Sequence, residues 1–142
     1  MNLIIRSGGI EDADNCAKIV SNWISATEWM PRLYSQMQLS EMIKEAIPQR
    51  EFWVVGQPII GYLSFNVESL QVVALYTATP GKGIGKALLD KIKERYRYLH
   101  LWSHSANIGA HKFYRREGFN SVGSKKEGTD GIPEIQFEWS GS

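Results

Sequence analysis

A glycine-rich stretch in the middle of the chain has the residue types that bind phosphate. Residues 79–89 read TPGKGIGKALL and join an expected strand to an expected amphipathic helix. The first N–H groups of a helix have no acceptor inside it, and the helix dipole adds about half a positive charge there. Glycine has no Cβ, so an anion can approach this backbone closely. Lys82 and Lys86 oppose the dipole, which is explained if an anion binds among them.

Two familiar phosphate-binding motifs do not fit this stretch. A Walker A loop, GxxxxGK[ST], fails because Pro80 and Ala87 replace its first glycine and its hydroxyl residue. The dinucleotide fingerprint GxGxxG fails in both registers, because Lys86 and Leu88 stand where its third glycine should be. A solvated turn before an ordinary helix remains the alternative for the loop taken alone.

A second motif downstream makes the pattern specific. Residues 107–119 read NIGAHKFYRREGF, which fits N-x-x-A-x-x-F-Y-x-x-x-G-F. With the preceding strand, glycine turn, helix and strand, this motif resembles the cofactor half of the GNAT (Gcn5-related N-acetyltransferase) family. The resemblance covers roughly residues 70–122, and the flanking elements agree with the family's order. Pro80 departs from the family's usual Gln or Arg, and the sequence leaves its effect on cofactor affinity open.

The resemblance implies acetyl-CoA (coenzyme A) as the cofactor. The strand before the loop would pair through its backbone with the pantetheine arm, and amides at the helix start would hold the pyrophosphate. Each hydrogen bond to a charged group contributes roughly 1.5–3 kcal/mol, so about four to six could anchor the cofactor without any particular side chain. Asn107 would bond the pantetheine. The cofactor-binding residues implied are Leu75, Tyr76, Thr77, Lys82, Gly83, Ile84, Gly85, Lys86, Ala87, Asn107, Ala110 and Tyr114.

The resemblance also gives Tyr114 a catalytic role toward the departing thiolate. Tyr114 shares a helix face with Asn107 and Ala110, because these residues are three and four positions apart. A thiol titrates near pH 8.5 and a phenol near pH 10, so full proton transfer is uphill by about 2 kcal/mol. Hydrogen-bond stabilisation of the thiolate is therefore favoured. The alternative is an aromatic packed beside Phe113 and Phe119.

The acceptor amine must be neutral to attack. A lysine-like amine loses about 4–5 kcal/mol to deprotonation at pH 7, whereas an α-amine near pKa 8 loses little more than about 1 kcal/mol. His104, just past a strand end, and Glu28 are candidate general bases. Water is a third candidate, and a surface position for His104 is the alternative.

An acceptor site is expected in the connection between the two early helices. Trp29, Arg32 and Tyr34 cluster there with Met30. An apolar wall with an arginine suits a small substrate that has an apolar part and a carboxylate. A Trp29 that only covers the core is the alternative.

Composition excludes several classes of protein. The chain has 142 residues and a formal charge of +1, which argues against a nucleic-acid binder. It has no apolar run of about 20 residues and no visible export signal, so a cytoplasmic protein without membrane contact is expected. Cys16 is the only cysteine and is expected to be buried. The three histidines have no familiar metal-ligand spacing, so no metal is expected.

The expected elements follow the order β-α-α-β-β-β-α-β-α-β-β. Hairpin strands are expected at residues 52–55 and 59–65, helices at 36–47 and 107–117, and a solvated turn at 125–127. The predicted fold class is α/β (α+β), with a GNAT-like, mostly antiparallel sheet of about seven strands flanked by about four helices. Residues 1–142 are expected to form a single domain.

Three functions follow for testing. The first is acetyl transfer from acetyl-CoA to a primary amine of a small molecule or amino acid, by direct attack in a ternary complex. The second is acetylation of a protein terminus or lysine. The third is a non-catalytic acyl-CoA-binding module that regulates a partner. A homodimer stays open.

Overall fold

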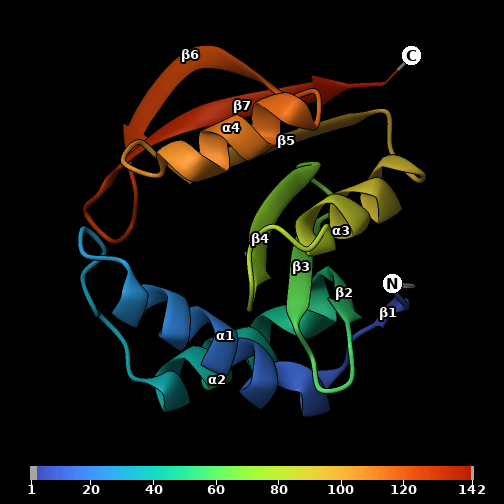
Figure 1. The fold of residues 1–142 in the computed structure, drawn as a ribbon, viewed down its shortest axis with the longest axis vertical. Coiled ribbons are helices and arrows are strands. Elements are labelled where there is room, and N and C mark those ends of the chain that lie inside the picture. The colour runs from blue at the N-terminus through green and yellow to red at the C-terminus, as the bar shows by residue number, and fades with distance from the viewer. Residues whose placement is uncertain (1–2, 142) are drawn as a thin grey trace.

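The computed structural model describes residues 3–141, and a seven-stranded sheet runs through them (Figure 1). The strand order is β1-β2-β3-β4-β5-β7-β6, and within these residues only β4 and β5 pair in parallel. Two short 3-10 turns, Ile10–Asp12 and Ile47–Gln49, flank the early helices. The expected fold class and element order are confirmed. The elements are β1 (Ile5–Ser7), α1 (Ala13–Ala26), α2 (Gln36–Ala46), β2 (Glu51–Val55), β3 (Gly61–Asn66), β4 (Gln71–Thr77), α3 (Ile84–Lys93), β5 (Tyr98–His104), α4 (Ile108–Arg116), β6 (Asn120–Glu127) and β7 (Pro133–Ser140).

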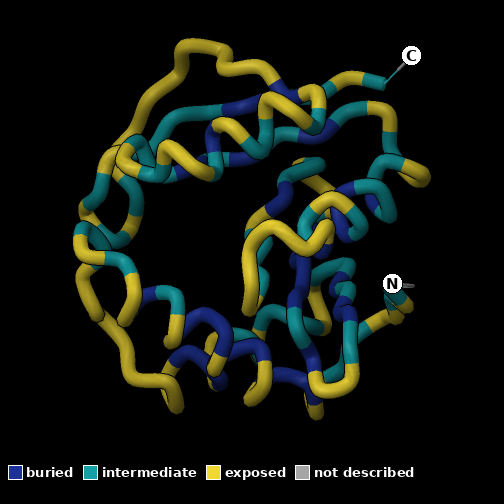
Figure 2. The backbone as a smooth tube through the Cα atoms, in the orientation of Figure 1, coloured by how far each residue is buried: buried dark blue, intermediate teal, exposed yellow. Residues whose placement is uncertain are grey.

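Each face of the sheet carries its own core, because successive side chains of a strand point to opposite faces. Leu75 of β4 packs against the core that contains Leu88 and Leu89 of α3. Its neighbour Tyr76 packs against the core that contains Cys16 of α1. The tube in Figure 2 is dark blue along β3 and much of α1, where these cores meet the sheet.

Cys16 is fully buried in the α1 core, as expected. Burial, and then the charge of Asp12, raise the pKa of its thiol to about 12. A thiol with such a pKa is almost entirely protonated at neutral pH and is a poor nucleophile.

The two parallel strands in the centre of the sheet separate soon after they meet. Their only paired positions are Gln71 and His100. From there β4 continues to Thr77 and β5 to His104, and the two arrows diverge in Figure 1. The edge of β4 that faces β5 therefore has no strand partner beyond Gln71 within residues 3–141.

The expectation for residues 125–127 was wrong. They belong to β6, which pairs with β7 from Lys125↔Ile135 to Glu127↔Pro133. The ladder is irregular between Ser121 and Lys125, where Gly123 has φ +81°. The polar residues of this segment suggested a turn. They are polar because β6 is an exposed edge strand, and edge strands commonly carry charged side chains.

No helix among residues 3–141 is long and apolar enough to cross a membrane.

An ion pair fastens the first strand to the start of α1. Both oxygens of Asp12 accept from Arg6, at 2.9 and 2.8 Å, and the Gly9 N–H donates to Asp12 at 2.9 Å. Asp12 is only 5% exposed. The hydrogen bond from Arg6 lowers the pKa of this carboxyl, although burial opposes the shift.

Replacing Asp12 by Asn should lower the free energy of unfolding by about 1–3 kcal/mol, because a hydrogen bond between charged groups is lost. A depressed folded-state pKa stabilises the protein above the unfolded pKa of about 3.9, and that stabilisation is lost as pH falls through the folded value. Urea unfolding of both proteins between neutral and acid pH measures this difference. The exposed Glu11→Gln in the same turn is the control, and equal losses in the two variants would refute the role of the pair.

Candidate functional site

The glycine loop presents unpaired N–H groups at the start of α3. Gly83 is the N-cap residue, and Gly81 and Gly83 have φ of +78° and +75°. A Cβ on either would meet nothing within 4 Å, so the space beside the loop is open. The N–H groups of residues 83–86 have no backbone acceptor within the described chain, whereas the Ala87 N–H donates to the Gly83 oxygen at 3.1 Å. Ala87 was therefore wrongly placed among the donors.

The Lys86 side chain is paired with two carboxylates. Its ammonium lies 3.2 Å from Asp90 and 3.3 Å from Glu117, away from the loop backbone. Hydrogen bonds to Asp90 and then Glu117 raise the pKa of Lys86. These carboxylates explain the lysine without a bound anion. Lys82 is exposed in the loop.

The third glycine brings α3 close to α4. A Cβ on Gly85 would lie 3.0 Å from the Cζ atom of Phe113. This close approach places the first turn of α3 beside the helix that carries Tyr114. Gly85 therefore has a packing role in addition to exposing its N–H.

Asn107 begins α4 as its N-cap residue. Its Oδ1 accepts from the Ala110 N–H at 3.2 Å, and the Asn107 N–H donates to the His104 oxygen at 3.0 Å. The start of α4 is thus tied to the end of β5. The amide nitrogen of the Asn107 side chain makes no hydrogen bond within residues 3–141.

Tyr114 is held among aromatic rings with its hydroxyl unengaged. Its ring lies 5.3–5.9 Å from the rings of Phe113, Phe119 and Phe137. Within residues 3–141 the hydroxyl has no hydrogen-bond partner, and it is not a buried unsatisfied atom, so solvent reaches it. Burial, and then the nearby Tyr76, raise the pKa of this phenol well above its usual range. The site does nothing to make Tyr114 a stronger acid.

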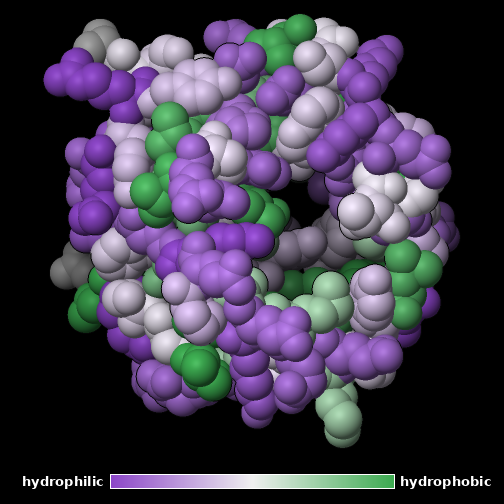
Figure 3. Space-filling view, turned by 180° about the vertical axis from the view of Figure 1, so that it is seen from behind, coloured by the Kyte–Doolittle hydropathy of each residue, from purple (hydrophilic) through white to green (hydrophobic). Residues whose placement is uncertain are grey.

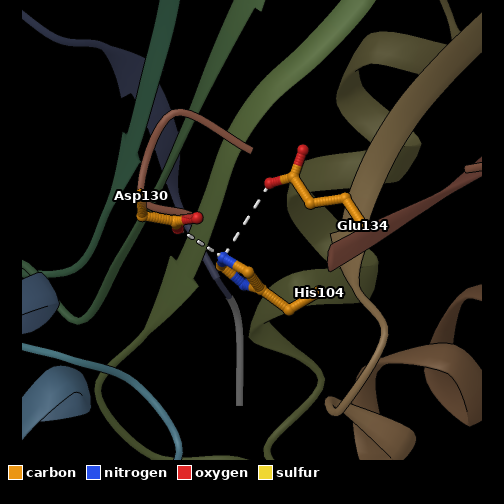
Figure 4. A group of neighbouring side chains, drawn as sticks. All are labelled: His104, Asp130 and Glu134. Carbon is orange, nitrogen blue, oxygen red and sulfur yellow. Dashed lines mark hydrogen bonds and ion pairs between the residues drawn. The ribbon is translucent and has the colours of Figure 1, made fainter. Parts of the chain in front are cut away.

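The His104 imidazole, at the end of β5, lies against two carboxylates (Figure 4). Its Nε2 is 2.8 Å from Oδ2 of Asp130 and 3.8 Å from Oε2 of Glu134. The three side chains are only 16–17% exposed. Burial raises the pKa of Asp130, but hydrogen bonds from His104 and the Ile132 N–H outweigh it, so the pKa is lowered. Asp130 is therefore ionised at neutral pH.

Two tryptophan side chains pack against the His104 imidazole. Trp23 stacks on it, with ring centroids 6.1 Å apart and an interplanar angle of 22°, and Trp29 lies tilted at 5.2 Å. Tyr76 of β4 contacts Trp23 at 5.6 Å. Burial, followed by the charges of Asp130 and Glu134, raises the pKa of Tyr76 to about 12. The end of β4, the end of β5 and helix α1 are thus joined through one cluster of aromatic rings.

The surface is hollowed where these elements meet. Seen from behind, the space-filling view has an opening near its centre (Figure 3). It corresponds to the region of Figure 1 where β4 and β5 diverge. The unpaired N–H groups at the start of α3 follow β4 in the chain, and His104 is the last residue of β5, so the two groups belong to the two strands that diverge here.

Comparison with known proteins assigns the family. The family model described as an acetyltransferase (GNAT) domain matches residues 18–140. The chain belongs to the GNAT family. The family resemblance read from the glycine loop and the residue 107–119 motif is confirmed.

Individual GNAT relatives are distant in sequence. A peptidyl-lysine N-acetyltransferase, YiaC of Escherichia coli (strain K12), is 23% identical over 85% of this chain and 88% of its own length. The solution structure of YjaB from E. coli in its apo form has a TM-score of 0.78 and 20% identity, with both chains fully covered. The PaiA N-acetyltransferase of Thermoplasma acidophilum, solved with coenzyme A, has a TM-score of 0.68 and 21% identity over 99% of each chain. Members of the fold thus bind coenzyme A.

The acceptor-side residues expected in this GNAT chain are only partly brought together. Trp29 contacts His104, but Glu28 is exposed and makes no hydrogen bond or ion pair within residues 3–141. Arg32 donates to the Ser21 oxygen and hydroxyl, the Ser25 hydroxyl and the Tyr34 oxygen, at 2.8–3.2 Å. Its guanidinium thus joins the α1–α2 connection to α1. Tyr34 is 43% exposed at the surface.

Sequence reasoning missed both carboxylates beside His104. Glu134 is the cross-strand partner of His104 in the β5–β7 ladder, so their side chains share a face. An antiparallel pairing of the two expected strands could have suggested this contact. Asp130 lies in the loop between β6 and β7, and no sequence signal places it.

The same group has the donor types of a metal site. One nitrogen and two oxygens from His104, Asp130 and Glu134 lie within 4.8 Å of one another. Histidine spacing could not reveal this group, because two of its members are carboxylates from another part of the chain. The nitrogen is Nε2 of His104, and its 2.8 Å distance from Asp130 is explained by a hydrogen bond between the two side chains.

Replacing Asn107 by Ala should destabilise the cofactor-free protein by about 1 kcal/mol, because α4 loses its N-cap. Asn107→Asp should retain most of the stability, since a carboxylate also caps a helix. Chemical unfolding compares the three proteins. Equal stability of the Ala variant and the wild type would contradict a capping role and leave the side chain for other uses.

Proposed function

We propose that this chain moves an acetyl group from acetyl-CoA to a primary amine of a small molecule or amino acid, by direct attack in a ternary complex. The observation that carries this proposal is the row of unpaired N–H groups at residues 83–86, beside a strand edge without a partner. A diphosphate satisfies such donors, and the dipole of α3 favours its charge. A thioester arm can then follow the free edge of β4.

The cofactor is placed on the side of the sheet that carries α3 and α4. The pyrophosphate accepts from the amides of Gly83, Ile84, Gly85 and Lys86, and the backbone of residues 75–77 pairs with the pantetheine. Lys82 is exposed in the loop and supplies a further positive charge to the pyrophosphate site. Ala110 leaves room beside the arm, and the free amide of Asn107 donates to it.

Tyr114 stabilises the leaving thiolate by hydrogen bonding. Its raised pKa makes full proton donation to sulfur unfavourable before the C–S bond breaks, so its part is electrostatic. The amine nitrogen attacks the carbonyl carbon, the C–N bond forms and the C–S bond breaks. The proton released from nitrogen ends on the sulfur after the C–S bond has broken.

A lysine side chain in a peptide is the second candidate acceptor. It is favoured by the charge of the acceptor side, where the acidic side chains at His104 are Asp130 and Glu134 and Arg32 is engaged with α1. The distant relative YiaC, a peptidyl-lysine N-acetyltransferase, points the same way.

Calorimetry with coenzyme A, together with thiol release from acetyl-CoA, tests the proposal. The panel should contain simple amines, amino acids and lysine-containing peptides. Binding of coenzyme A with turnover of at least one amine supports it. Binding without turnover of any amine would indicate a non-catalytic acyl-CoA module, and absence of binding would refute the cofactor assignment.

Gly83→Ala should weaken coenzyme A binding by about 10- to 100-fold, the equivalent of one hydrogen bond to a charged group. The added Cβ would stand where the phosphate approaches. Gly123→Ala is a matched control, because Gly123 also has positive φ and open space but lies in β6. Each variant should lose about 1–2 kcal/mol of stability through backbone strain. The same coenzyme A affinity in both variants would place the pyrophosphate elsewhere.

Tyr114→Phe should lower kcat by about 10- to 100-fold and leave coenzyme A affinity nearly unchanged, because the hydroxyl acts on the thiolate only as it forms. Steady-state kinetics and calorimetry measure the two effects. Because the pKa of Tyr114 is raised, the wild type should not lose this donor as the pH is brought toward 10. Tyr98→Phe, at the start of β5, is the control, and an unchanged kcat for Tyr114→Phe would exclude the role.

A further inference from the structure

We propose that Asp130 is a positioning residue, which fixes the His104 imidazole with Nδ1 as the proton acceptor for the incoming amine. The inference rests on the proposed function and deepens it, because it assigns the base and the atom that acts. It also gives a role to the β6–β7 loop, which the sequence motifs do not include.

The hydrogen bond to Asp130 selects the tautomer of His104. An ionised carboxylate can only accept hydrogen bonds, so the His104 nitrogen that lies 2.8 Å from Asp130 must carry a hydrogen. That nitrogen is Nε2, and in a neutral imidazole the lone pair then belongs to Nδ1. Within residues 3–141, Nδ1 has no hydrogen-bond partner and is not sealed from solvent.

The surrounding structure holds both partners in place. The second oxygen of Asp130 accepts from the Ile132 N–H at 3.0 Å, which fixes the carboxylate within its own turn. The His104 backbone oxygen accepts from the Asn107 N–H at 3.0 Å and lies 2.9 Å from Nε2 of buried His111. Trp23 and Trp29 restrict the ring itself. The imidazole is therefore oriented before any substrate arrives.

Glu134 contributes in a different way from Asp130. Its carboxylate is 3.8 Å from the same nitrogen, which is beyond hydrogen-bond distance, and 3.8 Å from the Lys126 ammonium. It adds negative charge near the ring without choosing the tautomer. Asp130 therefore selects the tautomer of His104, whereas Glu134 contributes only its charge.

The proton balance of the step is simple. An acceptor that arrives as an ammonium gives one proton to Nδ1 of His104, and the neutral amine attacks the thioester carbonyl carbon. The imidazolium is stabilised through its Nε2–H by Asp130 and later returns its proton to solvent. The proton that leaves nitrogen when the amide forms is the one that the thiol carries away.

Nitrogen-15 NMR of the imidazole tests the tautomer without any substrate. The wild type should show a protonated Nε2 and an unprotonated Nδ1 for His104, and Asp130→Asn should shift the ring toward a mixture of tautomers. A wild-type ring protonated at Nδ1 would overturn the inference. If the tautomer is as expected but no amine is turned over, the proposed function is refuted. The contact by which Asp130 positions His104 would still stand.

Kinetics distinguish positioning from charge. Asp130→Asn should lower kcat by about 10- to 100-fold with KM for acetyl-CoA nearly unchanged. Glu134→Gln removes the same charge beside the ring and should cost distinctly less. Equal losses in the two variants would overturn the inference in favour of a purely electrostatic effect. Thermal unfolding of both variants shows whether the β6–β7 loop has kept its structure, and Asp130→Glu should recover part of the lost rate.

A chelator experiment tests whether His104, Asp130 and Glu134 bind a metal ion instead. Treatment with EDTA should leave the wild-type rate unchanged, because Nε2 is engaged by a hydrogen bond to Asp130. Loss of activity with EDTA and recovery with Zn²⁺ would overturn the inference, since Nε2 would then be a metal ligand.

Discussion

The separation of β4 from β5 is the constraint on which the rest of the site depends. Unpaired backbone groups in a protein interior are costly unless another partner satisfies them. Because these strands share only the Gln71–His100 pair, β4 presents an open edge in the middle of the sheet. A ligand with amide and carbonyl groups can complete that edge as a neighbouring strand would. The start of α3 follows one of these diverging strands in the chain, and His104 ends the other.

Much of the fold and of the cofactor side could be predicted from the sequence, because the signals there are local. The glycines of the loop and the apolar periodicity of α3 are properties of adjacent residues. The partners of Lys86 were not predicted, because one of them is distant in the sequence. Lys86 is paired with Asp90 one helical turn on and with Glu117 from the end of α4, and the second partner cannot be read from the loop.

The acceptor side could be predicted much less well, because it is built from contacts between distant segments. Arg32 looked like a ligand for a carboxylate, yet its hydrogen bonds go back to α1. His104 was found as a candidate, but the carboxylates that define its surroundings lie 26 or more residues away and come together only through the β5–β7 ladder. Charge at this site is therefore a property of the tertiary structure and not of a motif.

The division of the sheet into two cores has an evolutionary consequence. The glycine loop, α3 and α4 come from one stretch of chain, whereas the surroundings of His104 are assembled from α1, the α1–α2 connection and the β6–β7 loop. Substitutions in the second group can accumulate without disturbing the glycine loop. Two homologues can thus differ around the residue that corresponds to His104 while they inherit the same glycine loop.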